Sequence, residues 1–148
     1  KFFQPINFDV LWYAYDFKMH DPVKTGMIIP PTARLRPIKE EKTTKLDYAW
    51  WGGIKTGEGD HLQFVTSANG SATFEKGNYE LGVTWDDAVR VYVDDKLVIN
   101  EWNPSLYKFD ESPHKTIKLA LEGKHSFTVE HVEIGGFATL SLKIKKLN

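Results

Sequence analysis

The chain has 148 residues, of which 41% are hydrophobic and 14% aromatic, and its formal net charge is −1. This length is common for one domain and is sufficient for an ordinary hydrophobic core. The small net charge offers no electrostatic attraction for nucleic acid or an anionic membrane surface, and no apolar stretch approaches the ~20 residues of a membrane helix. The chain contains no cysteine, which excludes disulfides and thiolate metal sites.

The start of the chain carries no secretory signal pattern. Lys1 stands where an initiator Met would be, and no long apolar region or small-residue cleavage site follows it. We therefore expect a module or fragment of a longer exported protein, located outside the cell, on the cell surface or in the periplasm, with neighbouring domains of the parent protein as possible partners.

The first half of the chain is irregular. Residues 8–17 are apolar or aromatic at most positions, which predicts a strand covered on both sides. Residues 20–45 contain four prolines and mixed charge. Because proline lacks the N–H that a sheet ladder needs, we expect a surface excursion here that can include one edge strand. Shorter strand candidates follow at 46–51, 62–66 and 71–74.

The second half alternates between apolar and polar residues with a period of two. The pattern is clear in residues 79–85, 89–93, 117–121 and 138–144. Such alternation indicates strands with one buried and one solvated face, as in antiparallel sheets. No comparably long apolar stripe at helical spacing is present, so the sequence predicts an all-β protein.

Turn-forming residues separate these runs. They lie at 76–78, 94–96, 122–124 and 135–136, each between two strand candidates. Short strands joined by tight turns are typical of a sandwich or barrel. We predict a single antiparallel β-sandwich, jelly-roll-like, over residues 1–148.

The adjacent acids Asp86 and Asp87 interrupt this alternation, since they close one apolar strand directly before another. Successive side chains of a strand point to opposite faces, so a regular strand would send one carboxylate into the core, where an unpaired charge is costly. Two interpretations remain open. The pair accepts backbone N–H groups in a tight bend, or it binds Ca²⁺, which prefers oxygen ligands.

The surrounding motifs match a known pattern. Residues 77–99 run through a Gly-x-Tyr strand, the Asp86-Asp87 corner, a second strand, an acidic turn before Lys96 and an aliphatic strand, after which Trp102 follows. This order resembles the core of the anthrax protective-antigen N-terminal domain family. Residues 121–130 and 135–142 resemble the last two strands of that family, so the best-matched core is 77–144.

The resemblance implies a β-sandwich of the kind found in bacterial toxins, glycosidase accessory domains, adhesins and yeast flocculins. In the sugar-binding members, two corner aspartates joined by a cis peptide hold Ca²⁺, which the glycan hydroxyls also contact. Carried over to this chain, the metal-binding pair is Asp86 and Asp87. The glycine of the family corner is Ala88 here, which puts that backbone geometry in doubt.

Candidate sugar-contacting residues lie in two short segments. Trp50 and Trp51 stand beside glycines and offer a stacking platform, with packing of one ring in the core and the other on a sheet edge as the alternative. Backbone carbonyls around Gly135 and Gly136 are further candidates, because family members place a binding loop there. The five histidines show no metal-site spacing, and we expect His125 and His131 to be structural.

The sequence thus favours a non-catalytic carbohydrate-binding module that is Ca²⁺-dependent through Asp86 and Asp87, with a glycan or polysaccharide as partner. The alternative is a structural or protein-interaction domain of the same fold without a sugar site. A small glycan hydrolase is a third hypothesis, although the chain has no nucleophile elbow or phosphate loop.

Overall fold

A computed structural model describes residues 3–14, 21–26, 36–51, 53–56, 59–102, 113–135 and 137–148. The described residues form one short helix and ten strands: β1 (Asn7–Ala14), α1 (Pro22–Thr25), β2 (Lys39–Thr43), β3 (Leu46–Trp51), β4 (Ile54–Thr56), β5 (Gly59–His61), β6 (Phe64–Asp86), β7 (Ala88–Val93), β8 (Lys96–Glu101), β9 (His114–Glu133) and β10 (Phe137–Lys146). The all-β prediction is confirmed. α1 has only four residues, and among the described residues no helix is long and apolar enough to span a membrane.

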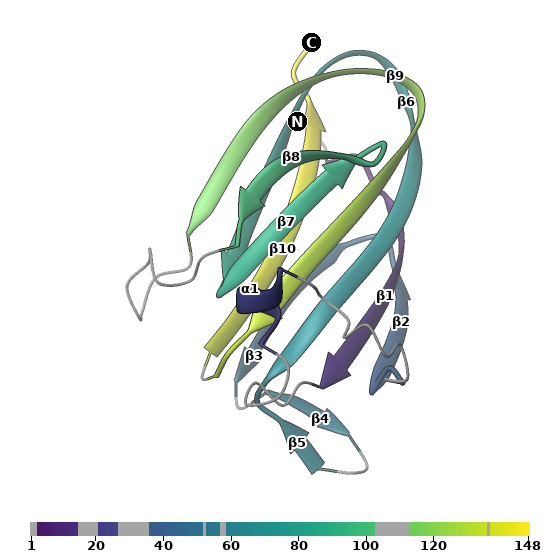
Figure 1. The fold of residues 1–148 in the computed structure, drawn as a ribbon. Helices are drawn as coiled ribbons and strands as arrows, with labels where there is room; N and C mark the ends of the chain where they lie inside the picture. The colour runs from purple at the N-terminus through teal and green to yellow at the C-terminus, as the bar shows by residue number, and fades with distance from the viewer. Residues whose placement is uncertain are drawn as a thin grey trace.

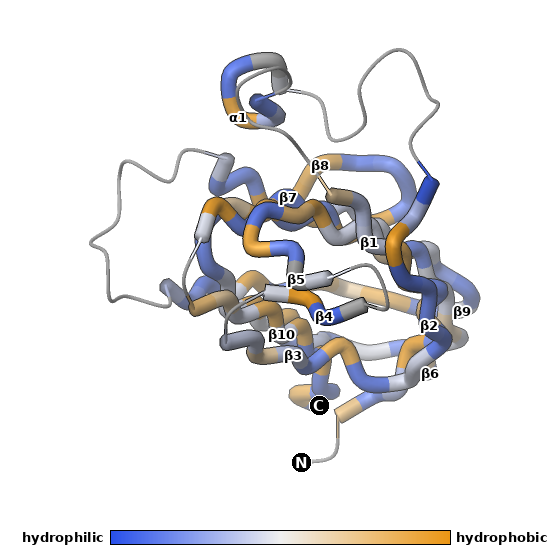
Figure 2. Tube along the Cα trace, turned by 90° about the horizontal axis from the view of Figure 1, so that it is seen from below, coloured by the Kyte–Doolittle hydropathy of each residue, from blue (hydrophilic) through white to orange (hydrophobic). Residues whose placement is uncertain are grey.

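The strands form an antiparallel sandwich in which β6 and β9 run through both layers (Figure 1). One layer has the order β2-β1-β6-β9-β7-β8, and the other places β3 and β10 beside the remaining parts of β6 and β9. The first part of β6 pairs with β1, and the part after Gly77 pairs with β10. Seen from below, β1, β7 and β8 lie in one layer, with β3 and β10 in the other (Figure 2).

The turns predicted at 76–78 and 122–124 are wrong. Both segments lie inside the long strands β6 and β9, where the register shifts between Phe74 and Gly77 and Gly123 adopts a φ of 79°. A β-bulge of this kind bends a strand without ending its ladder. Residues 64–66 of the candidate 62–66 and the whole of the candidate 71–74 belong to one strand, β6, which begins at Phe64. Glycine marks both a turn and a bulge in sequence, so the partner strand decides between them.

The core lies between the two layers, as the alternation predicts. The apolar residues of the runs in β6, β7 and β10 are buried, and Leu121 of β9 joins them. Trp12 and Trp85 are 1% and 2% exposed and fill the space between the layers. The prediction for the first strand is wrong in part, because Asp9 is exposed and β1 alternates over its first half. Residues 15–17 lie outside the described residues.

The proline-rich segment contributes an edge strand, β2, and the helix α1. Asp21 accepts hydrogen bonds from two backbone N–H groups at the start of α1. Trp102 Nε1 donates to the carbonyl of Pro22 at 3.0 Å, and Arg90 donates to the carbonyl of Gly26 at 3.0 Å. Trp102 therefore holds α1 against the outer face of the sheet. The Trp102 side chain itself packs on a small second apolar cluster outside the main core.

Candidate functional site

The acidic pair lies where the chain crosses from one layer to the other. Asp86 is the last residue of β6, and Asp87 forms the bend before β7. The Asp87 N–H donates to the carbonyl of Val132 at 2.8 Å, and Ala88 is paired with Val132, so the corner is tied to the end of β9. The peptide bond between Asp86 and Asp87 is cis, as the resemblance implies. Ala88 has no positive φ, so the corner does not require glycine at this position.

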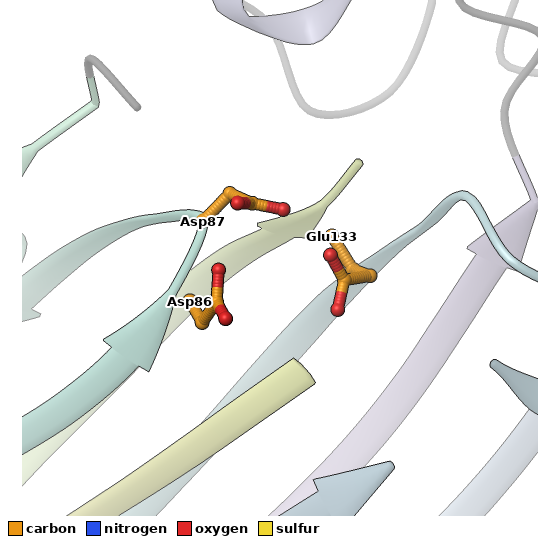
Figure 3. A group of neighbouring side chains, drawn as sticks. All are labelled: Asp86, Asp87 and Glu133. Carbon is orange, nitrogen blue, oxygen red and sulfur yellow. The ribbon is translucent and has the colours of Figure 1, made fainter. Parts of the chain in front are cut away.

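A third carboxylate, that of Glu133, completes the site. Glu133 ends β9, and one oxygen from each of Asp86, Asp87 and Glu133 lies within 4.8 Å of the other two. Figure 3 shows the three carboxylates gathered at the ends of these strands. The sequence interpretation missed Glu133. The sequence does contain a sign of it: residues 127, 129, 131 and 133 of β9 share the core-facing side of the strand, and the last of them is an acid.

Glu133 is fully buried, with 0% exposure. Its Oε1 accepts the N–H of Gly135 at 2.9 Å, while the buried Oε2 has no hydrogen-bond donor. Burial raises the pKa of Glu133 to about 10, with further contributions from a hydrogen bond to Asp87 and from the charges of Asp87 and Asp86. A buried carboxylate oxygen without a donor requires a proton or a cation beside it.

The aspartates have different environments. Asp87 Oδ2 accepts the N–H of Ile134 at 2.7 Å, which fixes the orientation of this carboxylate. Burial raises the pKa of Asp86 to about 8, with further contributions from a hydrogen bond to Asp87 and from its charge. The Ile134 N–H donates to one oxygen of Asp87 and the Gly135 N–H to one oxygen of Glu133, so the second oxygen of each group accepts no loop amide.

His131 supports the corner from within the core. Its Nε2 lies 2.7 Å from the carbonyl oxygen of Asp86, and its Nδ1 lies 3.0 Å from the hydroxyl of Thr66. Because a carbonyl oxygen only accepts, Nε2 carries the proton and Nδ1 accepts from Thr66. Burial lowers the pKa of His131 to about 4, so the ring is neutral at physiological pH. His131 is thus structural, as predicted from its spacing.

The two predicted tryptophans have different roles. Trp50 is half-buried and packs against Phe64 at 5.0 Å and His131 at 5.8 Å between ring centroids. Trp51 points outward with 77% exposure and lies 4.5 Å from the ring of Phe137. Only Trp51 therefore presents a free ring face. Gly135 is exposed, and its N–H serves Glu133, while Gly136 lies outside the described residues.

The donor set suits a hard divalent cation. Three carboxylates lie together, one of them with a buried oxygen that no donor satisfies. Ca²⁺ takes six to eight oxygen ligands, whereas softer metals favour sulfur or imidazole. The nearby histidine uses both ring nitrogens in other hydrogen bonds and is not a ligand. The residues present therefore fit Ca²⁺.

Comparison with known proteins identifies the family. The family model of the PA14 domain matches residues 10–146. The chain belongs to the PA14 domain family. This family is named after anthrax protective antigen, so the resemblance seen in the sequence is confirmed. A search of curated proteins finds no match.

Solved structures share the PA14 fold at low sequence identity. The PA14 sugar-binding domain from an RTX adhesin is 16% identical with a TM-score of 0.68, over 97% of this chain and 91% of that one. The epithelial adhesin 6 A domain of Candida glabrata, solved with Galβ1-3GlcNAc, is 10% identical with a TM-score of 0.62, over 98% and 82%. The β-glucosidase from Kluyveromyces marxianus, solved with glucose, is 14% identical with a TM-score of 0.67, over 95% of this chain and 16% of its own. The chain thus spans a small part of that enzyme, and these likenesses show the fold.

Proposed function

We propose that this PA14 domain is a non-catalytic glycan-binding module that binds Ca²⁺ and sugar at the corner formed by Asp86, Asp87 and Glu133. The observation that carries the proposal is the grouping of three carboxylates within 4.8 Å around a buried oxygen that has no donor. Like charges at this separation repel one another strongly unless they are neutralised. A divalent cation neutralises these charges by binding the carboxylate oxygens that accept no loop N–H.

Side chains and backbone groups have different roles at the corner. Asp86, Asp87 and Glu133 would hold the cation, and the N–H groups of Ile134 and Gly135 orient two of the three carboxylates. Bound Ca²⁺ would supply open coordination positions for vicinal hydroxyls of a sugar. These positions suit a sugar because its hydroxyl oxygens are also hard ligands.

Trp51 supplies the apolar part of sugar recognition. Its exposed ring lies on β3 beside Phe137, which begins β10 directly after the loop that contains Gly135. A sugar ring bound at the corner can stack its C–H face on an aromatic ring while its hydroxyls face polar groups. A site with a few convergent polar groups and an adjacent aromatic wall is typical of ligand recognition.

The burial of Glu133 argues against hydrolysis. Glycoside hydrolysis uses two carboxyl groups that flank the glycosidic bond, so both must reach the substrate. Glu133 is fully buried, and each of Asp87 and Glu133 is held by a backbone N–H. This arrangement supports binding. The structural similarity to two adhesin domains supports an exported setting for the parent protein.

The test combines calcium titration with glycan binding. Calorimetry should show Ca²⁺ binding by the wild type, and a glycan array should show binding that chelator removes. The double variant Asp86→Asn/Asp87→Asn should lose both, while Asp9→Asn/Asp95→Asn, which alters two exposed acids, should retain both. Glycan binding that persists unchanged in chelator and in the first variant would overturn the mechanism. Absence of Ca²⁺ binding at millimolar concentration would support the structural alternative.

A further inference from the structure

The outer face of the β10 layer carries a row of polar side chains that begins beside the acidic corner. Outward-facing residues of β10 and β6 alternate with the buried ones, and His114 and Thr116 of β9 lie opposite Thr84 and Gly82. We call the following set the outer strip: Thr139, Ser141, Lys143, Lys145, Glu80, Gly82, Thr84, His114 and Thr116. Register places Thr139 opposite Asp86 and Ser141 opposite Thr84. The outer strip therefore continues directly from the end of β6 at which the acidic corner lies.

Part of the outer strip is hollowed into a groove of about 260 Å³. Gly82 lies at its centre, where a Cβ atom would come within 3.3 Å of the His114 ring. The missing side chain thus leaves a depression in an otherwise regular sheet surface. His114 Nδ1 lies 2.7 Å from the Thr84 hydroxyl, which fixes the ring at the groove wall.

The groove walls carry hydroxyl and ammonium groups that can form hydrogen bonds to a ligand. Thr116 and Ser141 present hydroxyls, and hydroxyls can both donate and accept. Lys143 and Lys145 are held loosely, at 3.9 Å from Asp47 and 3.7 Å from Glu80. Exposed pairs at such distances contribute little to stability, so these ammonium groups are available to a ligand.

Aromatic rings stand at both ends of the outer strip. Trp51 and Phe137 are paired at the start of β10, two residues before Thr139, which lies opposite Asp86, and Phe3 lies at the far end of the groove opposite Lys145. Phe3 is 55% exposed, and an antiparallel β-bridge between its backbone and that of Lys145 holds it at the strip. At about 3.4 Å per residue, the distance along β6 from Asp86 to Glu80 is about 20 Å. This span exceeds one sugar ring and suits a short oligosaccharide.

We infer that the outer strip is a set of additional subsites for a linear oligosaccharide that has one unit at the Asp86/Asp87/Glu133 corner. The inference rests on the proposed function and extends it from a single sugar to a chain. Continuity with the corner, the hydroxyl and ammonium groups of the groove, and the exposed rings at its ends define this ligand. Chain length then determines affinity, because longer ligands reach further along the strip.

The experiment measures affinity against chain length in the presence of millimolar Ca²⁺. The probes are cello-, xylo-, manno- and galacturono-oligosaccharides from monosaccharide to hexasaccharide. Wild-type affinity should rise at least about tenfold from the monosaccharide to the longest member of the bound series, as two or more added hydrogen bonds imply. The variant His114→Ala/Lys143→Ala should lose this gain and keep the monosaccharide affinity. The control Lys96→Ala/Lys124→Ala, at exposed positions away from the strip, should behave as wild type.

Location is tested independently by amide chemical shifts. The longest bound oligosaccharide should move the amide signals of residues 80–84 and 141–145, which the monosaccharide leaves in place. Calcium-dependent binding with no length dependence and no effect of the strip variant overturns the inference and leaves the proposed function standing. Length-dependent binding that survives chelator but not the strip variant supports the strip and overturns the metal corner. Absence of binding to every series overturns the strip as a site for linear glycans.

Discussion

His131 and Asp86 are linked across the core by a hydrogen bond of 2.7 Å from the imidazole Nε2–H to the backbone carbonyl of Asp86. The same ring accepts the Thr66 hydroxyl and stacks on Trp50, so a buried neutral histidine connects the acidic corner to the centre of the sandwich. Its backbone partner, Asp86, contributes a carboxylate to the proposed cation site. The corner is therefore held by the core as well as by its own loop.

Removing this link should destabilise the domain. His131→Phe retains the ring but leaves the Asp86 carbonyl and the Thr66 hydroxyl without their partner, and each buried unsatisfied group costs about 1–3 kcal/mol. We expect the free energy of unfolding to fall by about 2–4 kcal/mol in chemical denaturation, and Ca²⁺ affinity to fall with it. His125→Phe is the matched control on the same strand, and it should cost less than about 1 kcal/mol because its ion pair is exposed. Equal losses in the two variants would contradict this account.

Glu133→Gln should separate stability from metal binding. The amide keeps the shape of the protonated side chain and an oxygen that accepts the Gly135 N–H, but it cannot ionise to bind a cation. We expect unfolding in chelator to occur at the wild-type midpoint or above it, while calorimetry shows Ca²⁺ affinity lowered at least about tenfold, since a charged ligand is lost. Glu130→Gln is the control for metal affinity, because Glu130 pairs with Arg90 instead. Wild-type Ca²⁺ affinity in Glu133→Gln would exclude this residue as a ligand.

Calcium should stabilise the domain more at higher pH. The pKa values of Asp86 and Glu133 are raised to about 8 and about 10, so without a cation their contribution to stability is complete below their unfolded pKa values of 3.8 and 4.5. This contribution to stability is lost as the pH rises through about 8 for Asp86 and about 10 for Glu133, because the folded state must then release protons and hold negative charges close together. Bound Ca²⁺ offsets this repulsion and displaces the protons. We expect calcium to raise the thermal midpoint more at about pH 8.5 than at about pH 6 and to have no effect on Asp86→Asn/Asp87→Asn; a larger increase at the lower pH would contradict it.

Truncation of Trp51 should lower sugar affinity, whereas truncation of Trp50 should lower stability. Trp51→Ala removes an exposed ring, so stability should stay within about 0.5 kcal/mol of wild type, while sugar affinity falls about five- to tenfold through lost stacking. Trp50→Ala removes a ring packed against Phe64 and His131 and should cost about 3 kcal/mol or more. Thermal unfolding and sugar titration on both variants provide the measurement. A stable Trp51→Ala variant with undiminished sugar affinity would remove Trp51 from the site.

The hairpin between β7 and β8 should be most strongly held at mildly acidic pH. His125 Nδ1 contacts the Asp94 carboxylate and its Nε2 donates to the Glu122 carbonyl. The hydrogen bond to Asp94 raises the pKa of His125, so its stabilisation is complete below 6.5 and is lost as the pH rises through the folded value. The hydrogen bond to His125 lowers the pKa of Asp94, so that contribution is present above 3.8 and is lost as the pH falls further. The stability difference between wild type and His125→Gln should thus be largest between about pH 4 and 6.5 and stay below about 1 kcal/mol; a difference independent of pH would contradict this pairing.

Local patterns predicted most of the strands because their causes are local. The residues of β7 and the inward faces of β6 and β10 follow from alternation, since burial of one sheet face imposes a period of two. The shorter candidate at 46–51 coincides with β3. The same reasoning failed at Gly77 and Gly123. A bulge and a turn use the same residue, and only the partner strand shows that the ladder continues.

The sequence by itself determined an all-β sandwich and marked Asp86 and Asp87 as the point where alternation fails. Only the tertiary structure brought Glu133, 46 positions beyond Asp87 in the printed sequence, to the same corner and buried its carboxylate there. It also exposed Trp51 while packing Trp50 into the core. The physical reason is that alternation assigns each side chain to a face, whereas proximity between distant side chains depends on which strands pair and where each one ends.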